Sequence, residues 1–279
     1  MKTALLMGLM MAVFLVAGRA LGGQQGMTVA FVVAVLVNIG SWWFSDRIVL
    51  AMYGGQEVGP DQAPHLHAVI GDLARRAELP MPRVYLIPQA APNAFATGRD
   101  PAHAAVAVTE GLVRMMPSDE LRAVIAHELG HVRNRDTLIS VVAATMAGAL
   151  SMLASAARWG MFLGGRRDDR DGNPVVMLLT LIFAPFAAML IQLAISRSRE
   201  YEADAYAARL VGDGEPLARA LRRLEQGVQY GPGAATPSTA HLFIVNPFGD
   251  SGGLVSLFRT HPTTEERIRR LLAWTPGAE

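Results

Sequence analysis

The stretch Ala126-His127-Glu128-Leu129-Gly130-His131 contains an HExxH motif, which predicts both the local structure and the chemistry of this chain. The residues before it have the apolar spacing of a helix. On a helix, residues four apart lie on one face, so His127 and His131 are expected to direct both imidazoles at one metal ion. Glu128 lies at the rim of that face, within reach of a metal-bound water. Two nitrogen ligands, one non-ligating carboxylate and an open position are the arrangement of a zinc hydrolase.

A third protein ligand is needed, because catalytic zinc usually has three. The chain has no cysteine, so the ligand must be histidine, aspartate or glutamate. Glu200 is the best candidate, since Asp204 lies four residues later on the same helical face. Glu200 would bind the metal, while Asp204 would accept a hydrogen bond from a ligand imidazole and fix its tautomer. Asp136, five residues past His131, is a rival as ligand or supporting residue. The alternative is that residues 200–204 form an exposed acidic helix paired with nearby arginines.

Composition indicates a membrane protein. Of 279 residues, 51% are hydrophobic and 18% are charged, whereas a soluble domain carries about 25% charge. The mean hydropathy is +0.27. The net charge of +1 provides no large basic field, so we expect no nucleic-acid partner.

Four apolar stretches predict about four transmembrane helices, since a helix of about 20 residues spans a bilayer core. They cover about 3–20, 27–44, 138–163 and 175–195. The first two predict a retained hairpin with its turn at 21–26, because Arg19 and the following glycines make a poor signal-peptide cleavage site. Trp42 and Trp43 end this hairpin, as an aromatic belt would. The alternative for the third stretch is a buried helix of a soluble core.

Positive charge predicts the orientation, because lysine and arginine favour the cytoplasmic side of a membrane. In a four-span arrangement, one side holds both long polar segments, 45–137 and 196–279. The same side carries most of the flanking positive residues, which are Lys2, Arg47, Arg133, Arg135, Arg197 and Arg199. Arg19 and the arginines of the 164–174 linker fall on the other side. We therefore expect both termini and the site in the cytoplasm.

Local patterns predict a small sheet among helices. We expect a helix over 64–77, a helix opened by Ser118 as N-cap, and a final short helix that begins at 263–268. The HExxH helix either ends near Asn134 or continues toward the third apolar stretch. The remaining expectations are strands at 83–88 and 104–109, a turn or strand edge at 93–98, and a loop around 231–240.

Four blocks resemble the HtpX family of membrane-bound zinc metalloproteases, which is of gluzincin type and related to the CAAX prenyl proteases. They occur in the family's order and cover most of the chain. The blocks are Pro92–Gly98, Ile125–His131 with Asn134 and Asp136, Ser196–Asp204, and Thr260–Pro262 with Arg267 and Ile268. One departure is Thr263, where family members often have a second proline.

The resemblance implies His127, His131 and Glu200 as ligands of one zinc ion per chain, with Glu128 as catalytic base. Asp204 would support a ligand, and Asn93 falls in the block that lines the substrate cleft as an edge strand. His261 and Arg267 match positions thought to stabilise the oxyanion.

The resemblance also implies the architecture, a mainly α integral membrane protein with a cytoplasmic α+β zincin-like catalytic domain. We divide the chain into a transmembrane hairpin (1–53), the first catalytic part (54–137), a second transmembrane hairpin (138–195) and the second catalytic part (196–279).

The function expected is a zinc endopeptidase of the plasma (inner) membrane that removes damaged or misassembled membrane proteins under stress. One alternative is a processing protease with few substrates, such as a lipidated C-terminus. Another is an idle scaffold with structural zinc, which would need a fourth ligand such as Asp136 or His261. A site inside the bilayer is disfavoured by the arginines that flank the motifs.

Overall fold

The computed structural model describes residues 2–137, 197–228, 243–244 and 262–277. Several expectations lie outside the described residues. They are the apolar stretches 138–163 and 175–195, the loop around 231–240, and His261.

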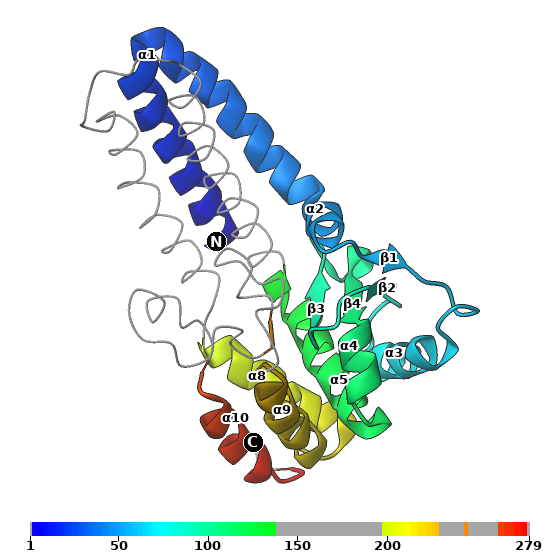
Figure 1. Cartoon of the computed structure of the whole chain (residues 1–279). Helices are drawn as coiled ribbons and strands as arrows, with labels where there is room; N and C mark the ends of the chain where they lie inside the picture. The colour runs from blue at the N-terminus through cyan, green and yellow to red at the C-terminus, as the bar shows by residue number, and fades with distance from the viewer. Residues whose placement is uncertain (1, 138–196, 229–242, 245–261, 278–279) are drawn as a thin grey trace, which may run out of the picture.

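The chain begins with a long helical hairpin, α1 (Lys2–Trp43), which rises above the other described elements (Figure 1). Helical geometry breaks at Gly22 and Gly23, and Gly23 has a positive φ of 58°. The two arms touch backbone to backbone near Gly18 and Gly26. The approach is so close that a Cβ on Gly26 would lie 2.3 Å from the Gly18 carbonyl oxygen. The predicted turn at 21–26 is therefore realised as a break of two glycines.

The described residues contain one helix long and apolar enough to cross a membrane, Gly22–Trp43. A shorter apolar helix, Met7–Arg19, lies in the first arm. Four transmembrane helices are thus not confirmed. At the end of the second arm, Trp42 and Trp43, which were predicted to form an aromatic belt, are 38% and 50% exposed. Exposed aromatic rings at the end of a membrane-spanning helix are what such a belt requires.

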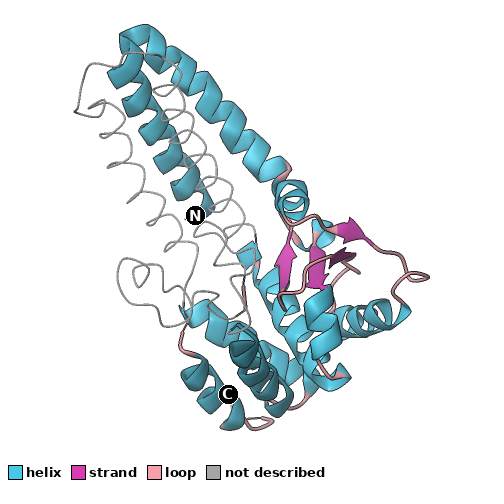
Figure 2. Cartoon of the chain, viewed as in Figure 1, coloured by secondary structure: helices cyan, strands magenta, loops and turns pink. Residues whose placement is uncertain are grey.

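A short helix, α2 (Ser45–Met52), leads from the hairpin to a four-stranded sheet (Figure 2). The strands are β1 (Gln56–Glu57), β2 (Arg83–Ile87), β3 (Ala94–Thr97) and β4 (Ala105–Thr109), in the order β1-β2-β4-β3. β2 and β4 run parallel, while β1 and β3 pair antiparallel to their neighbours. The predicted strands at 83–88 and 104–109 are confirmed, and 93–98 contains the edge strand β3.

Helices α3 (Pro64–Arg76), η1 (Pro101–His103) and α4 (Glu110–Met115) accompany the sheet. The HExxH helix is α5 (Ser118–Asn134). Ser118 was expected as its N-cap, and this is wrong: Pro117 precedes the helix, and the Ser118 hydroxyl lies 3.1 Å from Nε2 of His65. The helix ends at Asn134 because Arg135 adopts a left-handed conformation with φ 58°.

Three further helices complete the described chain: α8 (Arg197–Val211), α9 (Glu215–Val228) and α10 (Thr264–Leu272). The expected final helix is confirmed, and the Thr263 hydroxyl caps it by accepting the Glu266 N–H. α5 lies at the centre, in contact with β3, α3, α8 and α9. Its Val124, Ile125 and Leu129 are fully buried in one core cluster with residues of the sheet, α8 and α9.

α5 and α8 approach closely at Gly130. A Cβ there would lie 3.2 Å from both Ala203 Cα and Tyr206 Cδ1. The absence of a side chain at Gly130 lets α8 approach the helix that carries both histidines. The close approach of α5 and α8 is what brings distant segments of sequence into one site.

Candidate active site

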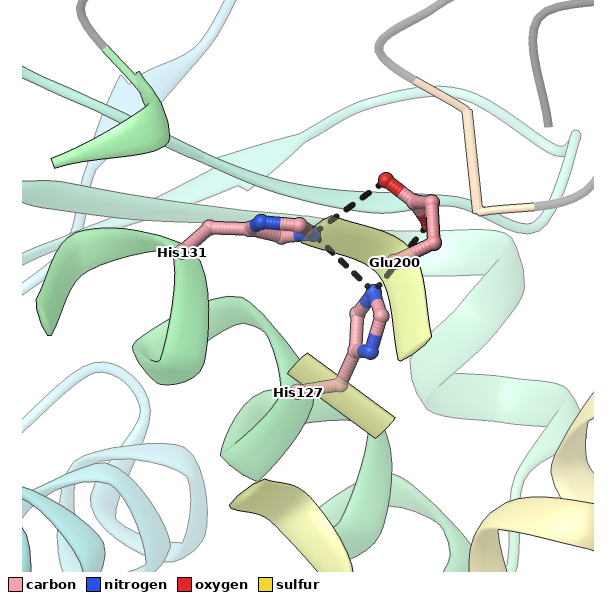
Figure 3. Close-up of side chains that lie close together, drawn as sticks. All are labelled: His127, His131 and Glu200. Atoms are coloured by element: carbon pink, nitrogen blue, oxygen red, sulfur yellow. Dashed lines mark hydrogen bonds and ion pairs between the residues drawn. The ribbon is translucent and has the colours of Figure 1, made fainter. Parts of the chain in front are cut away.

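The two histidines of α5 meet a glutamate of α8. Nε2 of His131 lies 3.2 Å from Nε2 of His127, and the Glu200 carboxylate faces both, at 3.8 Å from His127 and 3.6 Å from His131 (Figure 3). His127 and Glu200 are buried, with 2% and 7% exposed. Glu200 is therefore buried in the site, and the alternative of an exposed acidic helix over residues 200–204 does not hold for this residue.

This donor set fits a zinc ion. Zinc bonds of about 2.0–2.1 Å in tetrahedral geometry place neighbouring ligand atoms about 3.3 Å apart. The ligand atoms of His127, His131 and Glu200 all lie within 4.8 Å of one another, and no other such group occurs in the part of the chain that the structure describes. The imidazole nitrogens of buried His127 and partly buried His131 face each other and a carboxylate, and this set is well matched to one divalent cation.

Behind His127, an aspartate and an arginine form a compact ion pair. Nδ1 of His127 lies 2.9 Å from Oδ1 of Asp204. Nε and Nη2 of Arg267 donate to the two oxygens of Asp204 at 2.8 and 2.7 Å. Nη1 of Arg267 donates to the Ile244 carbonyl at 2.8 Å. Arg267 is 1% exposed, so the donors of its guanidinium are directed at groups of the protein.

The charges of this pair stabilise each other. Burial alone raises the pKa of Asp204, but Arg267 and His127 outweigh it and hold that pKa at about 2. Burial likewise lowers the pKa of Arg267, while Asp204 and Glu200 raise it above the ordinary arginine value. Asp204 therefore remains an ionised acceptor for His127 across the physiological range.

Behind His131, a second aspartate and arginine occur. Nδ1 of His131 lies 3.5 Å from Oδ2 of Asp136, and Nη1 of Arg199 donates to Oδ1 of Asp136 at 3.3 Å. Burial lowers the pKa of His131, but Asp136, Glu200 and Glu128 together raise it to about 9. The site therefore attracts positive charge.

Glu128 is joined to the edge strand of the sheet. Its Oε2 accepts the Ala96 N–H at 2.9 Å, and the residue is 6% exposed. Burial raises the pKa of Glu128, although His127, His131 and the Ala96 N–H act against this. A raised pKa makes a carboxylate a better proton acceptor.

Asn93 precedes the edge strand and connects it to a distant segment. Its backbone exchanges hydrogen bonds with Thr109, whose hydroxyl accepts the Asn93 N–H at 2.8 Å and whose N–H donates to the Asn93 carbonyl at 2.9 Å. Its Oδ1 accepts the Ile244 N–H at 3.4 Å. Since the Ile244 carbonyl binds Arg267, one peptide segment connects Asn93 to the pair behind His127.

The structure thus brings together all the predicted site residues that it describes. Two further participants, Arg199 and the Ala96 N–H, were not predicted. Arg199 stands directly before Glu200, but it was considered only as a charge that flanks the membrane and as a surface ion-pair partner of the acidic residues. Ala96 acts through its backbone, and only its place in the Pro92–Gly98 block marks it.

The profile of Peptidase family M48 matches residues 60–275, which include every one of these side chains. The chain belongs to peptidase family M48. It is therefore a metalloprotease, as the HExxH motif and the His-His-Glu group indicate.

Relatives with the name "Protease HtpX homolog" match nearly the whole chain. The one from Methylibium petroleiphilum is 52% identical over 99% of this chain and 98% of its own length. The one from Syntrophobacter fumaroxidans is 52% identical over 97% of each, and that from Pyrococcus furiosus is 51% identical over 97% of this chain and 94% of its own. The resemblance to the HtpX family is thereby confirmed.

A solved structure, Ste24p of S. mikatae, has a similar fold. The TM-score is 0.51 at 22% identity, over 95% of this chain. The match spans 62% of the length of that chain. The fold of this M48 member is therefore mostly helical with a small sheet, of the kind that Ste24p has.

Proposed function

We propose that the chain is a membrane-bound zinc endopeptidase in which His127, His131 and Glu200 hold one zinc ion. The observation that carries this proposal is the convergence of two Nε2 atoms 3.2 Å apart with the Glu200 carboxylate, directly beside buried Glu128, which accepts a hydrogen bond from the edge strand. Zinc, when bound, supplies Lewis acidity to a water molecule and to the scissile carbonyl.

Glu128 acts as the general base in this proposal. It accepts a proton from the attacking water and later passes it to the leaving amine. Its burial raises its pKa and so favours proton uptake, and the Ala96 N–H fixes one of its oxygens. The other oxygen is left to face the reacting water.

Substrate binds in extended form along the edge strand. β3 pairs on one side with β4, and its Ala96 N–H faces the opposite side, where Glu128 lies. A peptide added at that side would place its backbone next to the base, with Asn93 at the start of the strand. Backbone pairing gives broad sequence preference, which suits an enzyme that degrades many polypeptides.

Each of the two histidines has its own supporting aspartate. Asp204 orients His127, and Asp136 orients His131, because each lies at the Nδ1 atom of its ring. This position of Asp136 favours a supporting role over that of a ligand. Arg267 holds Asp204, and its predicted contribution to the oxyanion, with that of His261, remains part of the proposal.

In this proposal the chain keeps the division into two transmembrane hairpins and two catalytic parts, and the site and both termini lie in the cytoplasm. Two arginines are among the residues that connect the first part of the chain, 1–53, to the catalytic sheet. Arg99, just after β3, lies over the Trp43 ring at 4.9 Å, and Arg83 of β2 forms an ion pair with Asp46. The aromatic residues at the foot of α1 would therefore hold the edge strand near the bilayer surface.

The biological role is the quality control of membrane proteins at the inner membrane during stress. The alternative of a narrow processing protease predicts one dominant cleavage sequence, whereas quality control predicts many. Sequencing the peptides that the purified enzyme releases from a membrane-protein mixture separates the two.

The test of the chemistry is zinc content and casein cleavage of detergent-purified protein. Wild type is compared with Glu128→Gln, Glu200→Ala and, as control, Glu202→Ala, an exposed glutamate of the same helix. We expect one zinc per chain in wild type, no cleavage in the first two variants, weakened metal only in Glu200→Ala, and wild-type behaviour in the control. Tight zinc in every variant without any cleavage would favour the scaffold instead.

A further inference from the structure

The residues behind His131 repeat, from other elements, the arrangement behind His127. In each case an aspartate lies at the Nδ1 atom of the ring, and an arginine from a different part of the chain binds that aspartate. For His127 these are Asp204 and Arg267. For His131 they are Asp136 and Arg199.

Asp136 reaches His131 because the chain reverses directly after α5. Arg135 has φ 58°, a left-handed conformation that is unfavourable for a residue other than glycine. This turn ends the helix and returns Asp136 toward the last turn, which carries His131. Asp136 is then buried, with 7% exposed.

Arg199, near the start of α8, contacts the same aspartate, Asp136. Its side chain is buried, with 9% of the residue exposed, and Nη1 donates to Oδ1 of Asp136 at 3.3 Å. The next residue, Glu200, faces the opposite nitrogen of the same ring, at 3.6 Å from Nε2 of His131. Two consecutive residues of α8 therefore act on the two nitrogens of His131, one directly and one through Asp136.

We propose that Arg199 is a positioning residue, which holds Asp136 so that Asp136 orients the His131 ring toward the metal. This rests on the zinc site proposed above. The guanidinium holds the Asp136 carboxylate in place through a charge-assisted hydrogen bond. Asp136 would accept the Nδ1–H, which leaves the Nε2 lone pair of His131 for the metal ion held with His127 and Glu200. Removing such a supporting partner typically lowers metal affinity 10- to 100-fold.

Arg199 is a better subject for a test than Arg267. Arg267 is 1% exposed and binds Asp204 through two donors, so its removal leaves a deeply buried carboxylate without its partner. The contacts of Arg199 with Asp136 and of Asp136 with His131 are longer, at 3.3 and 3.5 Å. We expect its variants to fold and to change the metal site selectively.

The experiment measures zinc affinity by chelator competition in full-length protein in detergent, for Arg199→Gln, Asp136→Asn and the double variant. A matched control is Arg223→Gln, whose arginine pairs with buried Glu120 on another face of α5. We expect each single variant to lose 10- to 100-fold in affinity. The double variant should lose no more than the worse single one, because both act through one contact. Arg223→Gln should keep wild-type affinity.

Two further readouts separate positioning from a general structural role. Visible absorption of the Co²⁺-loaded protein reports ligand geometry, and it should change in Arg199→Gln but not in Arg223→Gln. Arg199→Lys, which retains the charge, should recover part of the affinity.

The proposal is overturned if Arg199→Gln binds zinc as wild type does, or if it lowers only the unfolding temperature. Additive losses in the double variant would overturn it as well. Glu200→Ala distinguishes this failure from a failure of the zinc site. If Glu200→Ala loses metal while Arg199→Gln does not, only the role of Arg199 is wrong. If neither loses metal, the zinc site itself is wrong.

Discussion

Nδ1 of His127 lies 2.9 Å from Oδ1 of Asp204, although the two residues belong to different helices. Both oxygens of that carboxylate also accept hydrogen bonds from Arg267. The orientation of one predicted metal ligand therefore depends on three separate segments of the chain, and changes in any of them should affect the metal before they affect the fold of the sheet.

Asp204→Asn should weaken zinc binding 10- to 100-fold, because an amide is a poorer partner for the ligand imidazole. It should also destabilise the protein by about 3–5 kcal/mol, since Arg267 is then a buried cation without its carboxylate. Chelator competition measures the first effect and urea unfolding in detergent the second. Glu202→Gln, at an exposed position of the same helix, is the control. Wild-type zinc affinity in Asp204→Asn would contradict the supporting role.

Arg267→Lys separates the two roles considered for this arginine. Lysine retains the charge but cannot bind both oxygens of Asp204 at once. If Arg267 acts by holding Asp204, zinc affinity and stability should both fall. If it acts only on the oxyanion, kcat should fall by roughly 100-fold at unchanged zinc affinity. Measuring kcat on zinc-saturated protein beside the zinc dissociation constant decides between them.

The sequence predicts the site well where one helix is enough. The spacing of His127 and His131 requires only that α5 be a helix, and its apolar residues establish that. Glu200 and Asp204 follow from the same rule on a second helix. The four-span arrangement placed both helices on one side of the membrane, and the family resemblance assigned them to one site. Their contact at Gly130 and Ala203 is tertiary, however, and no local pattern encodes it.

Other features had no local signal. The end of α5 depends on the left-handed Arg135, a conformation that sequence favours for glycine or asparagine. The bond from Ala96 to Glu128 uses a backbone N–H that every residue but proline possesses. Arg199 has two plausible uses, as a charge that flanks a membrane segment and as a partner of Asp136, and only the fold distinguishes them.

Metal removal should destabilise the protein. The site gathers the carboxylates of Glu128, Glu200 and Asp136 around His131, and a bound cation that the unfolded chain binds weakly raises stability by mass action. We expect 1,10-phenanthroline to abolish cleavage and to lower the unfolding temperature, and added zinc to restore both. In Glu200→Ala the chelator should have little further effect. An equal shift in wild type and Glu200→Ala would mean that the stabilising metal binds elsewhere.

Two glycine-to-alanine variants test whether the approach of α5 and α8 sets the metal site. Gly71 lies in α3, where a Cβ would meet only Met81 Sδ at 3.7 Å, an ordinary contact. Gly71→Ala should therefore stabilise the protein by about 0.5–1 kcal/mol through helix propensity. Gly130→Ala has the same propensity gain, but its Cβ would lie 3.2 Å from Ala203 Cα and Tyr206 Cδ1.

Gly130→Ala should therefore be less stable than Gly71→Ala in urea unfolding. It should also bind zinc more weakly, because Ala203 is adjacent to Asp204 and one turn from Glu200, so a displaced α8 carries the third ligand away from the histidines. Gly71→Ala should keep wild-type zinc affinity. If Gly130→Ala gained as much stability as Gly71→Ala and bound zinc equally well, the spacing of α5 and α8 would not control the site.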